Sequence, residues 1–172
     1  MAVTFAVKNL DEKRLPFGLG GHPGFCVPLV PDTSFEDYEL CFSHACAPDR
    51  VGFTEDLLLS GRDQPYPLQG GNILPLRHAL FDEDAIVLKN MARSVTLRSS
   101  KTNRSVTVSY PDMPYLGIWH APKTDAPYVC LEPWLSLPSR QGIVEELYSK
   151  SELKQLEPGG GYENTWSITI RE

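Results

Sequence analysis

Glu132 is the residue of this sequence with the strongest claim to acid/base chemistry. It closes the apolar run 129–131 and is followed directly by Pro133 and Trp134. A carboxylate at a strand end beside an aromatic side chain can have its proton affinity tuned for general acid/base catalysis. An aromatic face also stacks on the apolar face of a sugar. The alternative is a solvent-facing glutamate at the end of a strand.

His22 is the second candidate, because the residues around it make a stiff and irregular loop. The stretch 18–25 reads Gly-Leu-Gly-Gly-His-Pro-Gly-Phe. Glycine permits unusual backbone angles, while Pro23 fixes its own φ and favours an extended conformation at His22. The alternative is a tight corner whose histidine has no function. Spacing along the chain does not establish that His22 meets Glu132, but an antiparallel sheet permits it.

Other polar residues allow weaker predictions. Asp82 and Asp84 could bind a polyol or form a solvated acidic turn, and Trp119 could line a pocket or pack in the core. The segment holding Cys41, His44 and Cys46 suggests zinc, but no fourth ligand is evident and the segment fits a strand edge better. The sequence contains no phosphate-binding loop and no Gly-x-Ser-x-Gly nucleophile motif.

The elements that must position these residues are predicted to be strands. Alternating or β-branched runs recur about every ten residues, at 3–7, 38–42, 85–88, 94–98, 105–110, 115–119, 128–132 and 166–170, with an edge or irregular strand at 26–31 and a short strand at 57–59. The polar residues 99–104 predict a hairpin turn, and Pro133 is expected to end its ladder. The one helix-like segment is 143–156. This pattern predicts an all-β, antiparallel sandwich or barrel.

Length and composition limit the classes of function. A chain of 172 residues suits one domain, and a net charge of −6 argues against nucleic-acid binding. No apolar run is long enough for a membrane helix, and the N-terminus has no signal-peptide pattern. The four cysteines contain no Cys-x-x-Cys pair, so free thiols in a reducing, cytoplasmic compartment are expected.

The combined motifs resemble the aldose 1-epimerase (galactose mutarotase-like) family, in particular its LacX-like branch. The resemblance extends through nearly the whole chain and rests on the segments 16–25, 80–85, 115–119, 130–134 and 156–159. It implies an antiparallel β-supersandwich that interconverts the α and β anomers of free aldohexoses. No metal and no organic cofactor is implied.

The resemblance also implies roles for individual residues. Glu132 would remove the proton from the anomeric hydroxyl and His22 would protonate the ring oxygen, so that the sugar ring opens and recloses on the other face. Ordinary pKa values of about 4.3 for glutamate and 6.5 for histidine suit these roles near neutral pH. Asp82 would hold sugar hydroxyls, with Asp84 as the rival in register, and Trp119 and Trp134 would line the sugar site.

One departure from the family pattern is the early position of the histidine loop. Family members carry a substantial portion before this loop, which supplies strands and further sugar-binding residues. Residues 1–172 are therefore expected to form a single domain that corresponds to the C-terminal part of the supersandwich, incomplete at its N-terminus. Exposed strand edges would favour self-association.

Two other functions remain open from the sequence. The chain could be a non-catalytic carbohydrate-binding protein or a truncated remnant of this fold. It could also act on a phosphorylated sugar, which would need a basic cluster. Arg93, Arg98, Lys101 and Arg104 lie near one hairpin, but a solvated face accounts for them better.

Overall fold

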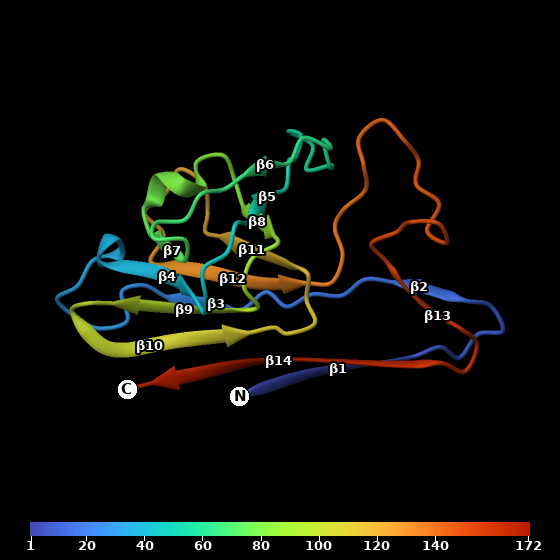
Figure 1. The fold of residues 1–172 in the computed structure, drawn as a ribbon, viewed down its shortest axis with the longest axis horizontal. Coiled ribbons are helices and arrows are strands. Elements are labelled where there is room, and N and C mark those ends of the chain that lie inside the picture. Colours follow the sequence, from blue (N-terminus) through green and yellow to red (C-terminus); the bar gives the residue numbers. More distant parts are fainter.

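The computed structural model describes all residues 1–172 and contains two stacked six-stranded sheets (Figure 1). The strands are β1 (Ala2–Lys8), β2 (Leu15–Phe17), β3 (Gly24–Cys26), β4 (Tyr38–Phe42), β5 (Asp49–Arg50), β6 (Gln64–Pro65), β7 (Ile73–Pro75), β8 (Ile86–Lys89), β9 (Ser94–Ser99), β10 (Thr102–Ser109), β11 (Tyr115–Trp119), β12 (Tyr128–Trp134), β13 (Lys154–Leu156) and β14 (Gly161–Arg171). Two short 3₁₀ helices, η1 (Phe35–Asp37) and η2 (His78–Phe81), complete the elements.

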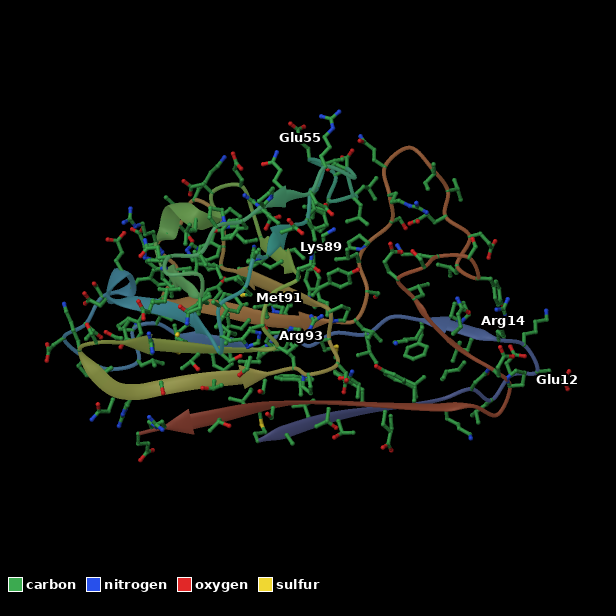
Figure 2. All side chains as sticks on the ribbon, viewed as in Figure 1. Glu12, Arg14, Glu55, Lys89, Met91 and Arg93 are labelled. Carbon is green, nitrogen blue, oxygen red and sulfur yellow. The ribbon has the colours of Figure 1, made fainter.

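Every paired strand is antiparallel. The first sheet has the order β1-β14-β10-β9-β4-β7, and the second has the order β3-β12-β11-β8-β5-β6. A small third sheet pairs β13 with β2, at the end of the molecule where β1 and β14 extend beyond the other strands (Figure 1). Figure 2 shows Glu12 and Arg14 at this far end. The all-β antiparallel sandwich predicted from the sequence is confirmed.

The main core lies between the two large sheets, and strand periodicity decides which residues enter it. Val129 and Leu131 of β12 are fully buried in a cluster of 25 residues, together with Leu116 and Ile118 of β11. Successive side chains of a strand point to opposite faces of its sheet. The alternate residues of β12, Cys130 and Glu132, therefore point away from the main core.

Most predicted strands are present. The hairpin is formed by β9 and β10, whose register pairs Thr107 with Thr96 and Val108 with Val95. β1, β4, β8, β11, β12 and β14 lie where the alternating runs predict them, within a few residues at their ends. No helix in the structure has the length and apolar character that crossing a membrane requires.

The prediction of a helix at 143–156 is wrong. These residues form turns and a long loop that ends in β13, and the loop projects from the sheets in Figure 1. Ile143, Val144 and Leu147 are exposed, so the apolar face has no surface to pack against. Side chains supply backbone contacts instead, since Gln155 donates to the carbonyls of Leu147 and Tyr148.

Smaller corrections concern individual segments. Pro133 does not end its ladder, because β12 continues and pairs Pro133 with Leu116. Residues 57–59 form isolated bridges at Leu59 rather than a strand. In the predicted strand 26–31, only Cys26 belongs to a strand, β3, and the residues after it form bends and turns. Ile170 is 71% exposed, because it lies beyond the end of β1, which pairs no further than Ser167.

The projecting loop is held by a buried ion pair. Lys150 donates to Glu145 Oε2 at 3.0 Å, and both side chains are almost fully buried. Lys150 also donates to the carbonyl of Pro138, and Arg140 donates to Glu145 Oε1 at 2.7 Å. The hydrogen bond from Lys150 is the largest cause that lowers the pKa of Glu145 to about 2, against the opposing effect of burial.

Lys150→Met is expected to loosen residues 139–153, because it removes the buried cation of Glu145 and leaves only the exposed Arg140 paired with this carboxylate. Amide hydrogen-exchange protection in this loop should fall at pH 7, while protection in the two large sheets is retained. The lowered pKa means that the pair stabilises the loop above the ordinary glutamate pKa of 4.5 and loses this effect as pH falls toward 2. Loop protection in the wild type and in Lys150→Met should therefore converge at low pH.

Arg140→Gln is the matched control, because the Arg140 side chain is largely exposed and exposed ion pairs contribute little. It should reduce loop protection much less than Lys150→Met does. Equal protection in all three proteins at pH 7 would contradict a role for the ion pair.

Candidate active site

The glycine-rich loop runs beside β12 and continues the ladder that β3 begins. β3 pairs Phe25 with Val129 and Gly24 with Cys130. Three further main-chain hydrogen bonds extend the same register: Leu131 N to Pro23 O at 3.0 Å, Gly21 N to Pro133 O at 2.9 Å, and Leu135 N to Leu19 O at 2.9 Å. This register puts His22 directly opposite Glu132.

The hydrogen-bond pattern also fixes how the two side chains face each other. The bonds at Gly21–Pro133 and Pro23–Leu131 flank His22 and Glu132, which makes these two a non-hydrogen-bonded pair. In such a pair the side chains lie on the same face, with Cα atoms about 4.5 Å apart. His22 Nε2 lies 3.2 Å from Glu132 Oε1. The side chain of His22 is 63% exposed and that of Glu132 only 4% exposed.

The pair lies at a cavity on the outer face of the second sheet. The cavity has a volume of about 1110 Å³, and its lining includes His22, Glu132, Trp134, Trp119 and Asp84. The structure thus brings together five of the six predicted site residues. Asp82 is exposed at the end of η2 and does not line this cavity.

Burial is the main influence on the proton affinity of Glu132. It raises the pKa of the carboxyl group, the charge of Asp84 raises it further, and the charge of His22 opposes both. Because His22 lies 3.2 Å from Glu132, the two side chains can serve as a proton donor and a proton acceptor at the same place. This arrangement can perform general acid/base chemistry on a molecule bound in the cavity.

Asp84 is held by two hydrogen bonds. Its Oδ1 accepts from the indole Nε1 of Trp119 at 2.7 Å and from the backbone N of Ala85 at 2.9 Å. Its backbone lies in the left-handed region, with φ of 73°, a region that aspartate and asparagine tolerate better than most residues. The Trp119 ring also lies edge-on to His22, with ring centroids 6.0 Å apart. Asp84, rather than Asp82, is therefore the carboxylate that lies at the cavity.

Two glycines make room for Trp134 and Glu132. A Cβ atom on Gly20 would lie 2.7 Å from Trp134 Cδ1. A Cβ atom on Gly117, which pairs with Glu132 across β11 and β12, would lie 3.1 Å from Trp134 Cζ2 and 3.3 Å from Glu132 Cβ. These distances leave no free space for a larger residue at either position.

Sequence reasoning missed several residues near the pair. Cys130 points to the same face as Glu132, and the signal for this is their separation by two residues on one strand. Arg50, Arg62 and Lys123 also line the cavity, but they come from loops and a strand of two residues whose position no periodicity predicts. Outside the cavity lining, His78 Nδ1 lies 3.1 Å from Nε2 of the buried His120, a contact that the sequence does not indicate.

Comparison with known proteins identifies relatives along nearly the whole chain. The chain is 35% identical over 170 residues to protein LacX, chromosomal, of Lactococcus lactis subsp. lactis, in an alignment that covers 96% of this chain. The chain spans 56% of the length of that relative. No protein-family model matches the chain.

Solved structures with the same fold include two from lactobacilli. One is a galactose mutarotase-like protein from Lactobacillus casei, with 32% identity, a TM-score of 0.88, and coverage of 99% of this chain and 58% of that protein. The other is a galactose mutarotase related enzyme from Lactobacillus acidophilus, with 27% identity, a TM-score of 0.90, and coverage of 99% of this chain and 57% of that protein.

Gly117→Ala is expected to disturb the site while the fold is retained. The added methyl group must displace Trp134 and Glu132, and overpacking of this kind typically costs about 1–3 kcal/mol of unfolding free energy. Denaturant unfolding measures the loss, and tryptophan fluorescence or near-ultraviolet circular dichroism reports the displaced indole.

Gly161→Ala is the matched control in β14, because its Cβ atom would meet Val7 O at 3.8 Å, an ordinary contact. We expect its unfolding free energy to stay within about 0.5 kcal/mol of the wild type. A Gly117→Ala protein with wild-type stability and fluorescence would contradict the close packing described.

Proposed function

Because this chain resembles the aldose 1-epimerase (galactose mutarotase-like) family in sequence and fold, we propose that it interconverts the α and β anomers of free hexoses. The observation that supports this proposal best is the pair formed by His22 and Glu132, 3.2 Å apart at a cavity large enough for a monosaccharide. Anomer exchange needs one group that takes a proton and one that gives a proton, both near the same sugar carbon.

The proposed reaction moves two protons and breaks one bond. Glu132 accepts the proton of the C1 hydroxyl while His22, in its protonated form, donates a proton to the ring oxygen. The bond between C1 and the ring oxygen breaks, and its electron pair stays on the oxygen as the C1 carbonyl forms. After rotation about C1–C2, the ring oxygen attacks the other face of the carbonyl and both protons return.

The geometry of the pair suits this reaction. The C1 hydroxyl and the ring oxygen are bonded to the same carbon, so their acid and base must also lie close together. The exposure of His22 lets its ring turn aside to admit a sugar, while Glu132 stays fixed in the floor formed by β12. Trp119 and Trp134 offer aromatic surfaces for the apolar faces of the sugar.

The basic hairpin residues predicted from the sequence give no support to a phosphorylated sugar, although Arg50, Arg62 and Lys123 line the cavity. Two of the basic residues singled out in the sequence have acidic partners, since Arg98 pairs with Glu39 and Lys101 with Asp37. Arg93 donates to the carbonyl of Met113. None of them lines the cavity that holds the acid/base pair.

His22→Asn and Glu132→Gln should each reduce the rate of anomer exchange by about 10²–10⁴-fold, because each removes one proton-transfer group and leaves a similar shape. Exchange is measured by NMR magnetisation transfer or by polarimetry on freshly dissolved α-galactose and α-glucose. The variants are compared with the wild type and with buffer alone.

His44→Asn and Glu163→Gln are the matched controls, since both residues are exposed and lie outside the cavity. They should exchange anomers at the wild-type rate. Wild-type protein that binds a sugar but exchanges it no faster than buffer would instead support the non-catalytic carbohydrate-binding alternative. Full activity in both His22→Asn and Glu132→Gln would overturn the residue assignment.

Asp84→Asn should raise the KM for sugar about tenfold, because a carboxylate that accepts sugar hydroxyls becomes a weaker acceptor. Asparagine tolerates the left-handed backbone at this position, which limits damage to the fold. Asp82→Asn is the control, because Asp82 is exposed and does not line the cavity, and it should leave KM unchanged. A rise in KM for Asp82→Asn alone would reverse the assignment between the two carboxylates.

A further inference from the structure

We propose that His22, Cys130 and Glu132 form a binding site for one thiophilic divalent cation such as Zn²⁺. Each residue offers one ligand atom, a ring nitrogen, a sulfur and a carboxylate oxygen, and these atoms all lie within 4.8 Å of one another. Cys130 and Glu132 are buried, while His22 is exposed at the cavity. A cation bound here would inhibit the proposed anomer exchange, since that acid/base chemistry needs no metal.

The donor set determines which cations fit. Nitrogen, sulfur and carboxylate oxygen are the ligands that zinc takes in proteins, and a thiolate selects zinc and cadmium over magnesium and calcium. Three protein ligands leave a fourth position for water or another small ligand. Because His22 and Glu132 line the cavity, the fourth coordination position would be open to the cavity.

The distances require only a modest contraction of the site. Tetrahedral zinc with bonds of about 2.0–2.3 Å brings neighbouring ligand atoms to about 3.4 Å from one another. His22 Nε2 and Glu132 Oε1 are already 3.2 Å apart. Cys130 and Glu132 project from the same face of β12, two residues apart, so they are fixed relative to each other. The exposed ring of His22 can move to close the remaining distance.

Access to the sulfur depends on Gly24. This glycine lies opposite Cys130 in the ladder, so no side chain crosses from β3 onto the thiol. A Cβ atom at position 24 would lie 3.4 Å from Sγ. The carboxylate of Asp84 adds negative charge near Glu132, which favours a cation in this part of the cavity.

The thiol is neutral before a cation binds. Burial, and then the charge of Glu132, raise the pKa of Cys130 to about 11. A coordinating divalent cation reverses this preference, because its charge displaces the thiol proton into solvent as the metal–sulfur bond forms. Binding is therefore an exchange of a proton for a metal ion and needs no oxidant or reductant.

Cd²⁺ serves as the probe, because a thiolate–cadmium bond gives a charge-transfer absorption band in the ultraviolet. Chelator-treated wild-type protein should develop this band with one Cd²⁺ per chain. Cys130→Ser should lose the band and bind Cd²⁺ at least tenfold more weakly, and Glu132→Gln should keep a band but bind more weakly. Far-ultraviolet circular dichroism establishes that each variant is folded.

Cys26→Ser is the matched control, since Cys26 lies on neighbouring β3 and its thiol is exposed and outside the three-residue set. It should keep both the band and the affinity of the wild type. The proposal is overturned if saturating Cd²⁺ gives no band in the wild type, or if the band survives Cys130→Ser and disappears in Cys26→Ser.

Inhibition of anomer exchange is a separate measurement and rests on the proposed function. Zn²⁺ bound to His22 and Glu132 would occupy both the acid and the base. Stoichiometric Zn²⁺ should then stop exchange in the wild type, and a chelator should restore it. Each protein is compared with its own metal-free rate, and Cys130→Ser should need at least tenfold more Zn²⁺ for the same inhibition.

The absorption and activity measurements separate the two proposals. A wild-type cadmium band without any exchange activity supports the metal site and overturns the proposed function. Exchange activity without a band supports the function and overturns the metal site. A band together with exchange that saturating Zn²⁺ does not slow would overturn the inhibitory role.

Discussion

Main-chain hydrogen bonds between the glycine-rich loop and β12 are the constraint on which the site depends. They carry the register of β3 forward to His22 and so bring that residue opposite Glu132. A slip of one residue would turn the His22 side chain to the other face of the ladder. The loop therefore pairs with β12 as an extension of β3 would, although its glycines and Pro23 are not typical of a strand.

The burial of Glu132 opposes folding and is tolerated because of its surroundings. A carboxylate that is 4% exposed loses most of its hydration, and the imidazole of His22 is the polar side chain that faces it, at 3.2 Å. Glu132 also takes a place on the outer face of a sheet, where Gly117 and Gly20 contribute no side chain. The proposed chemistry thus rests on positions that add little to stability, as is common for functional sites.

Much of the fold follows from local sequence. Alternation of apolar and polar residues was sufficient to predict the hairpin of β9 and β10 and the strands β1, β4, β11 and β14, because each has one face in the core. The same reasoning failed at 143–156, where Glu145 and Lys150 are buried as an ion pair while the apolar side chains of the loop stay exposed. It failed also at Pro133, since a proline interrupts a ladder only where its missing N–H would have donated.

The site is less predictable, because its geometry depends on register between segments far apart in the chain. Period-two alternation does establish that Cys130, Glu132 and Trp134 share one face of β12. It does not select β3 and its extension as the neighbour, a choice made by hydrogen bonds such as Gly21 N to Pro133 O. Once that neighbour is fixed, the imidazole of His22, the carboxylate of Glu132 and the thiol of Cys130 must lie together. The proposed proton transfer to a sugar and the proposed binding of a soft cation would then compete for the same atoms, because a ring nitrogen bound to a metal holds no proton to donate.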